Sequence, residues 1–209
     1  MKISASILSI KENIKENINI LTKTDIDYIH LDIMDGNFVN NKTFPIEEVK
    51  EFINDEKKLD VHLMVSDVKK YIDDFKCLNP EYITFHYETN CDIMDLISYI
   101  KSLNIKAGLS ICPETNVEVL DKYLPYIDLI LIMSVTPGAG GQKFMENSIN
   151  KIKYLKQKRG NNNYLISVDG GINDETIKLV ESDIAVVGSF ITNGNYHENI
   201  KKLKENIYE

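Results

Sequence analysis

The sequence of 209 residues lacks several features that mark particular classes of protein. It has no run of about 18 apolar residues, which a membrane-spanning helix would need, so we expect no membrane partner. Its first residues lack the long apolar segment of a secretory signal peptide. The cysteines are few, odd in number and without metal-ligand spacing, which predicts reduced thiols in a cytoplasmic protein: Cys77, Cys91 and Cys112.

Negative charge exceeds positive charge, and arginine is nearly absent. The formal net charge is −8, which argues against a nucleic acid as the partner. Of the 24 basic residues, a single one is an arginine, Arg159. An anion site in this chain therefore cannot depend on a cluster of arginine side chains, and it would have to use lysine or backbone N–H groups.

What the sequence does contain is a regular alternation of apolar, β-branched runs with polar segments of helical spacing. No linker, low-complexity segment or change in composition interrupts it, so we predict one domain over residues 1–209. Eight apolar runs alternating with helical segments predict βαβ units and a parallel sheet. The expected strands span residues 2–8, 28–34, 59–65, 82–88, 106–112, 129–135, 164–170 and 184–191, and the expected helices span residues 11–21, 45–53, 68–75, 93–103 and 148–158.

Eight repeats in about 200 residues fit an α/β fold of the (β/α)8 barrel type, with a doubly wound open sheet as the alternative. The number of repeats favours the barrel, and so does the position of unusual polar residues. They lie in, or just beyond, the C-terminal half of the expected strands, and barrel active sites are built at that face. These residues are His30, Asp32, His62, His86, Ser134, Asp169 and Ser189.

Two histidines and two aspartates stand out in this set. His30 and Asp32 are two positions apart on one expected strand, so their side chains point to the same side. His62 lies on the next strand and Asp169 on the seventh, and in a barrel these strand ends can converge across the mouth. The four residues suit a divalent metal ion, and the two carboxylates suit an acid–base pair. The alternative is that the histidines are hydrogen-bonded structural residues and the aspartates are turn residues.

Four other ionisable residues receive lesser roles. Asp60 stands at the start of its expected strand, where we interpret it as a cap or turn residue. Asp35 directly follows a strand and is interpreted as a turn residue or as a support for the site. His86 lies at the face of the mouth, where a supporting or packing role is favoured over a direct one. His197 is expected to be exposed to solvent.

Glycine-rich loops follow the last three expected strands. Glycines such as Gly138, Gly140 and Gly141 permit left-handed backbone conformations and let N–H groups approach an anion. Loops after strands seven and eight of a barrel frequently build a phosphate site. No loop matches a P-loop or a GxGxxG motif. Three such loops in a chain with one arginine predict a phosphate held by amides, and a flexible connection is the alternative.

Together these motifs resemble those of the ribulose-phosphate 3-epimerase family. The matching segments are "ISASILS", "HLDIMDGNFV", "DVHLMV", "MSVTPGAGGQKF", "VDGGI" and "VGSFI", in the family's order over nearly the whole chain. The resemblance implies a TIM barrel with one divalent metal ion per chain, Zn, Fe, Mn or Co, held by His30, Asp32, His62 and Asp169. It implies that Asp32 and Asp169 also form the acid–base pair. It further implies substrate contacts from Ser6, His62, Met34, Met64 and Met133, and phosphate contacts from Gly138, Ala139, Gly140, Gly141, Gly170, Gly171, Gly188 and Ser189.

The reaction implied by the resemblance interconverts D-ribulose 5-phosphate and D-xylulose 5-phosphate through an enediolate. The chain departs from the family's usual motifs at Ala5, at Asn37 and Asn40 in the loop after the second strand, and at Tyr87. No implied ligand is lost, so these changes bear on substrate preference. The alternatives are a 3-epimerase of a ketohexose phosphate such as D-allulose 6-phosphate, another phosphate-binding barrel enzyme, and a non-catalytic sugar-phosphate-binding barrel. A homo-oligomer is compatible with each of them.

Overall fold

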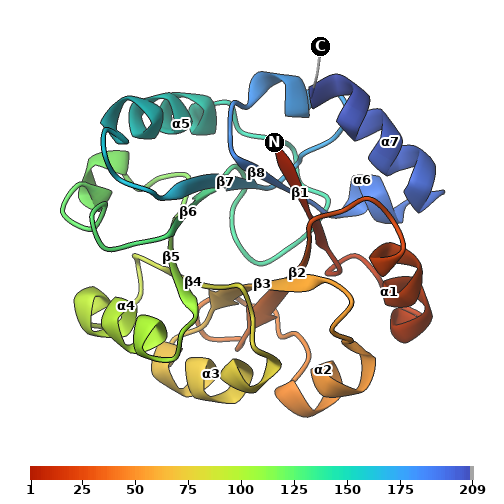
Figure 1. The fold of residues 1–209 in the computed structure, drawn as a ribbon, viewed down its shortest axis with the longest axis horizontal. Helices are drawn as coiled ribbons and strands as arrows, with labels where there is room; N and C mark the ends of the chain where they lie inside the picture. The colour runs from red at the N-terminus through yellow and green to blue at the C-terminus, as the bar shows by residue number, and fades with distance from the viewer. Residues whose placement is uncertain (208–209) are drawn as a thin grey trace.

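The computed structural model describes residues 1–207 and forms a closed barrel of eight parallel strands (Figure 1). Each strand is hydrogen-bonded to the next one along the chain, and the last strand closes onto the first. The fold is therefore the TIM barrel that the alternation predicts. The strands are β1 (Lys2–Ser6), β2 (Tyr28–Met34), β3 (Lys58–Met64), β4 (Tyr82–His86), β5 (Lys106–Ile111), β6 (Leu129–Met133), β7 (Leu165–Asp169) and β8 (Ile184–Val187).

Helices surround the barrel and connect successive strands (Figure 1). Two connections are shorter than the ideal repeat, because only a 3₁₀ helix stands between β5 and β6 and another between β7 and β8. The α-helices are α1 (Ile14–Thr22), α2 (Ile46–Phe52), α3 (Val68–Phe75), α4 (Ile93–Ser102), α5 (Asn147–Lys158), α6 (Ser189–Thr192) and α7 (Tyr196–Ile207), and the 3₁₀ helices are η1 (Lys76–Leu78), η2 (Val117–Leu120) and η3 (Thr176–Leu179).

The last strand is shorter than the sequence predicts. The apolar run over residues 184–191 continues beyond the strand, but β8 ends at Val187 and the helix α6 begins at Ser189. The backbone of Gly188 leaves the extended conformation, with φ −103° and ψ −98°, and this turns the chain out of the sheet. The expectation that the strand includes Ser189 is therefore wrong, although this residue still lies at the C-terminal end of the barrel.

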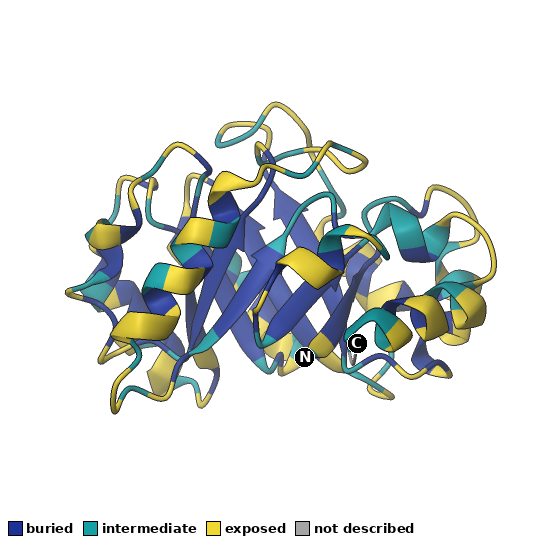
Figure 2. Cartoon of the chain, turned by 90° about the horizontal axis from the view of Figure 1, so that it is seen from above, coloured by how far each residue is buried: buried dark blue, intermediate teal, exposed yellow. Residues whose placement is uncertain are grey.

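The main hydrophobic core lies between the strands and the helices. Outward-facing strand residues such as Ile29, Val61 and Ile83 belong to the same buried cluster as the helical residues Ile18 and Ile72. The strands are buried along almost their whole length, whereas the helices expose their outer faces (Figure 2). This double covering is typical of parallel sheets and stabilises the barrel from outside.

The inside of the barrel begins with an apolar layer at its N-terminal end. Tyr28, Tyr82, Leu129 and Ile184 come from alternate strands and form a separate buried cluster. Four side chains from alternate strands are the usual layer of this fold. The layer closes the lower end of the barrel beneath the polar residues described next.

Above this layer the pairing of β2 with β3 stacks polar side chains inside the barrel. The register pairs His30 with Asp60 and, two residues further along, Asp32 with His62. Because alternate residues of a strand point to one side, all four side chains face inward, and the apolar residues between them face the helices. This alternation explains how a fully buried strand carries a histidine and an aspartate.

Within residues 1–207, no helix is long and apolar enough to cross a membrane. The three cysteines are free. His197 is exposed, as predicted.

Candidate active site

The C-terminal ends of the strands open into a cavity of about 380 Å³, a volume suited to a small ligand. Asp32 and Asp169 both line it. His62, expected to touch the substrate, is absent from the lining and is fully buried. The other residues expected to contact substrate or phosphate all line the cavity: Ser6, Met34, Met64, Met133, Gly138, Ala139, Gly140, Gly141, Gly170, Gly171, Gly188 and Ser189.

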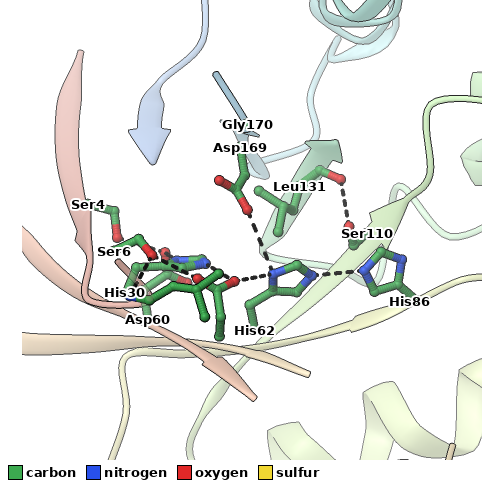
Figure 3. Close-up of polar contacts among 12 residues, drawn as sticks. Ser4, Ser6, His30, Asp60, His62, His86, Ser110, Leu131, Asp169 and Gly170 are labelled. Carbon is green, nitrogen blue, oxygen red and sulfur yellow. Dashed lines mark hydrogen bonds and ion pairs between the residues drawn. The ribbon is translucent and has the colours of Figure 1, made fainter. Parts of the chain in front are cut away.

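The four predicted metal ligands lie together, with Asp32 and Asp169 lining the cavity and both histidines buried behind its lining. Figure 3 shows His30, His62 and Asp169 of this cluster. His30 Nε2 lies 3.4 Å from Asp32 Oδ1, and His62 Nδ1 lies 3.2 Å from the same oxygen. His62 Nδ1 is also 3.9 Å from Asp169 Oδ2. One nitrogen or oxygen from each residue lies within 4.8 Å of the others, so these four atoms could surround one cation.

The chemistry of this cluster fits a divalent metal ion. His30 Nε2 is buried and forms no hydrogen bond with any residue in the range 1–207. A buried polar atom without a hydrogen bond is costly, and a cation between the four residues would satisfy it. Two imidazoles and two carboxylates are ligands that Zn, Fe, Mn and Co accept.

The far side of His30 is fixed by Asp60. His30 Nδ1 lies 2.8 Å from Asp60 Oδ2, which also accepts a hydrogen bond from Ser4 Oγ at 2.9 Å (Figure 3). The interpretation of Asp60 as a cap or turn residue is wrong, because its side chain points into the barrel and is 2% exposed. A signal was present in the sequence, since Asp60 stands two residues before His62. Metal-binding histidines commonly donate their second N–H to a carboxylate.

His62 has a different partner. Its Nε2 lies 2.9 Å from Nε2 of His86, and His86 Nδ1 lies 3.2 Å from Glu88 Oε2. His86 is fully buried and is absent from the lining of the cavity, which agrees with the supporting role favoured for it. Glu88 is not among the residues predicted for the site, although it follows His86 by two residues.

Asp32 and Asp169 have opposite pKa shifts. Burial alone would raise the pKa of Asp32, but His30 and His62 lower it below its ordinary value. Burial and the nearby charge of Asp32 raise the pKa of Asp169 to about 7. The arrangement therefore keeps one carboxylate ionised and lets the other hold a proton near neutral pH, a separation typical of acid–base sites.

The histidines next to these carboxylates also differ from each other. Burial alone would lower the pKa of His30, but the charges of Asp60 and Asp32 hold it well above its ordinary value. Burial lowers the pKa of His62, and it lowers that of His86 to about 4. The His62–His86 pair is therefore neutral at pH 7, so the positions of its two ring protons follow from hydrogen bonding.

Backbone segments form the other end of the cavity. Within residues 1–207, no lysine or arginine lines the cavity, and Arg159 pairs with Asp183 just before β8, at the opposite end of the barrel. The loops after β6 and β7 pack closely, because a side chain at Gly171, where φ is +64°, would lie 2.5 Å from the backbone N of Phe144. This part of the cavity therefore presents loop backbone rather than cationic side chains, whereas Lys11 and Lys42 line an adjoining cavity that shares the loop 138–141.

The loop after β2 reaches the same mouth. Asp35 accepts hydrogen bonds from the backbone N–H groups of Asn37, Phe38 and Ser66 at 2.8, 2.9 and 2.7 Å, which confirms it as a turn residue. Asn41 Nδ2 donates to the carbonyl oxygen of Gly138 at 2.6 Å. The segment that departs from the family's motifs therefore contacts the glycine-rich loop after β6.

Comparison with known sequences gives consistent matches along the chain. A family profile described as the Ribulose-phosphate 3 epimerase family matches residues 2–192. The chain is 37% identical over 219 aligned residues to the ribulose-phosphate 3-epimerase of Buchnera aphidicola subsp. Baizongia pistaciae (strain Bp), covering 97% of this chain and 94% of that protein. It is 36% identical over 200 residues to the ribulose-phosphate 3-epimerase of Bacillus subtilis (strain 168), covering 91% and 92%.

Solved structures with a similar fold are more distant in sequence. The 3-hexulose-6-phosphate synthase of Salmonella typhimurium superposes with a TM-score of 0.71 at 18% identity, covering 100% of this chain and 99% of that one. KGPDC from Streptococcus mutans superposes with a TM-score of 0.70 at 16% identity, covering 99% and 97%. At these identities the likeness establishes the barrel fold alone.

Proposed function

Because this chain belongs to the ribulose-phosphate 3-epimerase family, we propose that it interconverts D-ribulose 5-phosphate and D-xylulose 5-phosphate by inverting C3. The observation that carries the proposal is the meeting of Asp32 and Asp169, from β2 and β7 across the mouth, at the floor of one cavity. Inversion needs an acid–base group on each face of the reacting carbon, and two carboxylates from different sides of the barrel meet this need.

The origin of the two aspartates on different strands, β2 and β7, supports a division of the two proton transfers between them. The ionised carboxylate of Asp32 takes the C3 proton, which is acidic because it lies next to the C2 carbonyl. The protonated carboxylate of Asp169 returns a proton to the other face of the planar enediolate. In the reverse direction the two roles exchange. A positioned acid or base of this kind contributes about 10²–10⁴ in rate.

The same polar cluster also provides a site for a cation. His30, Asp32, His62 and Asp169 would hold one divalent cation, Zn, Fe, Mn or Co. When bound, it would supply Lewis-acid stabilisation of the negative charge that develops on the C2 and C3 oxygens. Ser6 Oγ donates to Asp32 Oδ2 at 2.8 Å and keeps this carboxylate oriented.

Different parts of the cavity would contact the reacting carbon and the phosphate. Met34, Met64 and Met133 are the last residues of β2, β3 and β6, and their apolar side chains line the cavity beside the two aspartates. They exclude water from the enediolate. Backbone amides of the loops after β6, β7 and β8 bind the phosphate, since no cationic side chain within residues 1–207 lines the cavity.

Solvent deuterium tests the mechanism. Enzyme with measured metal content is incubated with D-ribulose 5-phosphate in D₂O, and NMR follows C3. We expect deuterium at C3 of both epimers with wild-type enzyme, because carboxylate protons exchange with solvent. Asp32→Asn and Asp169→Asn should each lower epimerisation by at least about 10²–10⁴-fold. Each variant should still exchange C3 of the one epimer that faces its remaining base, with the pattern reversed between the variants.

Two results would contradict the proposal. A fully metallated Asp169→Asn variant that epimerises at near the wild-type rate would remove Asp169 from the acid–base pair. A wild-type enzyme that turns over D-allulose 6-phosphate much faster than either pentulose phosphate would reassign the substrate to a ketohexose phosphate.

A further inference from the structure

The two histidines of the metal cluster are held from behind in different ways. His30 contacts a buried carboxylate directly, through Nδ1 and Asp60 Oδ2. His62 Nε2 instead contacts a second imidazole, His86, and a carboxylate follows only after it. The chain from His62 through His86 to Glu88 lies outside the cavity and is not used in the proposed reaction.

Hydrogen-bond chemistry allows one arrangement of protons in this chain that suits a metal ligand. His62 Nδ1 faces the cluster and lies 3.2 Å from Asp32 Oδ1, to which it would donate a hydrogen bond in the other tautomer. To bind a cation Nδ1 must be unprotonated, and a neutral ring then carries its proton on Nε2. That proton can be donated only if His86 Nε2 is an acceptor. The proton of His86 must therefore stand on Nδ1, where it is donated to Glu88 Oε2.

Glu88 is fixed so that it acts as an acceptor. Its Oε1 accepts hydrogen bonds from the backbone N–H of Cys112, at 2.8 Å, and from the hydroxyl of Thr115. Burial alone would raise the pKa of Glu88, but His86, Thr115 and Cys112 lower it to about 2. The carboxylate is therefore ionised at neutral pH and presents Oε2 to His86.

The segment that holds Glu88 is itself anchored from the outer layer of the barrel. The ammonium group of Lys151, on α5, donates to the backbone carbonyls of Cys112, Pro113 and Thr115 at 3.0, 2.7 and 2.7 Å. The loop after β5 cannot then move away from Glu88 without breaking these bonds.

We propose that His86 and Glu88 are positioning residues that select the tautomer of His62, so that the lone pair of its Nδ1 faces the cation site. The inference rests on the metal site of the proposed function. Mutation of a group that is hydrogen-bonded to the far nitrogen of a metal-binding histidine typically lowers metal affinity by about 10–100-fold.

A metal ion bound directly by His86, Glu88 and Cys112 is the competing interpretation, since these residues also have ligand atoms within 4.8 Å of one another. Two observations favour the hydrogen-bonded chain. Both oxygens of Glu88 already have hydrogen-bond partners. Burial raises the pKa of the Cys112 thiol to about 12, which keeps it protonated and a poor ligand.

The substitution Glu88→Gln is the sharpest test, because it keeps the shape of the side chain and reverses one hydrogen bond. The amide oxygen must face the N–H of Cys112, which places the NH₂ group against His86 Nδ1. His86 would then have to accept there and donate from Nε2, which forces the proton of His62 onto Nδ1. Glu88→Ala removes the charge as well, but it leaves His86 free to donate to water.

Zn²⁺ affinity measured by chelator competition distinguishes the two variants. We expect Glu88→Gln to bind Zn²⁺ about 10–100-fold more weakly than wild type. Glu88→Ala should lose less, and so should Cys112→Ala, which keeps the backbone N–H and removes only the long contact of the thiol sulfur with His86 Nδ1 at 3.7 Å. Equal losses in both Glu88 variants, or a larger loss in Glu88→Ala, would overturn the proposal in favour of charge or packing.

Further measurements separate the remaining outcomes. The wild type without metal, labelled with ¹⁵N-histidine, should carry its protons on Nε2 of His62 and Nδ1 of His86. A proton on Nε2 of His86 would overturn the proposal even if the variants failed to fold. Two Zn²⁺ ions per wild-type chain, falling to one in Cys112→Ala, would also overturn it. Wild type that binds no divalent metal would instead contradict the proposed function.

Discussion

The two sides of the barrel mouth are built from different parts of the chain. On the side of β2, β3 and β4, ionisable side chains stand on strands, and each histidine of the cluster is fixed by a buried partner, Asp60 or His86. On the side of β6, β7 and β8, Asp169 ends β7, and the glycine-rich loops line the cavity at residues 138–141, 170–171 and 188–189. Strand register thus determines the position of the proposed acid–base and metal-binding groups, whereas loop conformation determines the shape of the proposed phosphate site. We expect changes on the two sides to have different consequences.

The largest effect should follow from His30→Ala on the strand side. The variant loses a proposed metal ligand and leaves the buried carboxylate of Asp60 with the hydroxyl of Ser4. We therefore expect loss of bound metal and of activity, together with a loss of about 3–5 kcal/mol in stability, because a buried charge loses its partner. Metal analysis and urea unfolding measure the two effects.

A matched double variant separates the two losses. His30→Ala with Asp60→Asn removes the unpaired charge, so stability should recover in part while metal binding stays lost. Full metal stoichiometry in His30→Ala would show that His30 is structural, and unchanged stability would show that Asp60 does not need its partner.

A change on the loop side should affect binding without affecting stability. Gly140 lines the cavity and has no positive φ, and a Cβ there would lie 3.1 Å from the hydroxyl of Ser9, a short side chain that can turn aside. Gly140→Val should fill space proposed for the phosphate and remove one or two hydrogen bonds to a charged group, each worth about 1.5–3 kcal/mol. We expect KM for the phosphorylated sugar to rise about 10–100-fold with a smaller change in kcat.

Steady-state kinetics with phosphorylated and unphosphorylated ribulose provide the check. In the Gly140→Val variant, the difference in KM between phosphorylated and unphosphorylated ribulose should be smaller than in the wild type. If the wild type turned over unphosphorylated ribulose equally well, the loop backbone would not be a phosphate site. Gly171 is less suited to this test, because a side chain there would meet the backbone of Phe144 and disturb the fold.

The smallest effect on activity should come from Asp35, which joins the loops after β2 and β3 and does not line the cavity. Burial alone would raise the pKa of Asp35, but the backbone N–H groups of Ser66, Phe38 and Asn37 lower it. A carboxyl group with a lowered pKa stabilises the fold above its unfolded pKa of about 3.9, and this contribution is lost as the pH falls through the folded value.

Asp35→Asn should therefore cost about 1.5–3 kcal/mol at pH 7, the usual value of hydrogen bonds to a charged group. The difference between wild type and variant should shrink at pH 3, because Asp35 is then increasingly protonated in the wild type. Urea unfolding at the two pH values measures it. A difference that grows in acid would contradict this account.

Local sequence patterns predicted the parts of the structure that depend on local geometry. The strand β2 and the helix α3 have the predicted limits, and the i, i+2 spacing of His30 and Asp32 correctly placed both side chains on one face. The alternation of eight apolar runs with polar segments was sufficient to predict the barrel. Each of these features follows from the period of the chain itself.

The features that were missed depend on contacts between distant segments. Asp60 was misread because its partner His30 stands on another strand, and only the register between β2 and β3 brings them together. Glu88 is held by the backbone of Cys112, which no local pattern indicates. The end of β8 depends on the conformation of Gly188, and an apolar run gives no sign of it.

The apolar layer of Tyr28, Tyr82, Leu129 and Ile184 fills the N-terminal end of the barrel, opposite the cavity. The two aspartates lie on the open side of this layer and line the cavity, so their hydrogen atoms exchange with bulk water through the mouth, where the proposed sugar phosphate would also bind. Solvent exchange at the two aspartates therefore competes with the return of a hydrogen to a bound sugar, and the fraction of deuterium found at C3 would report how fast water reaches them through the mouth.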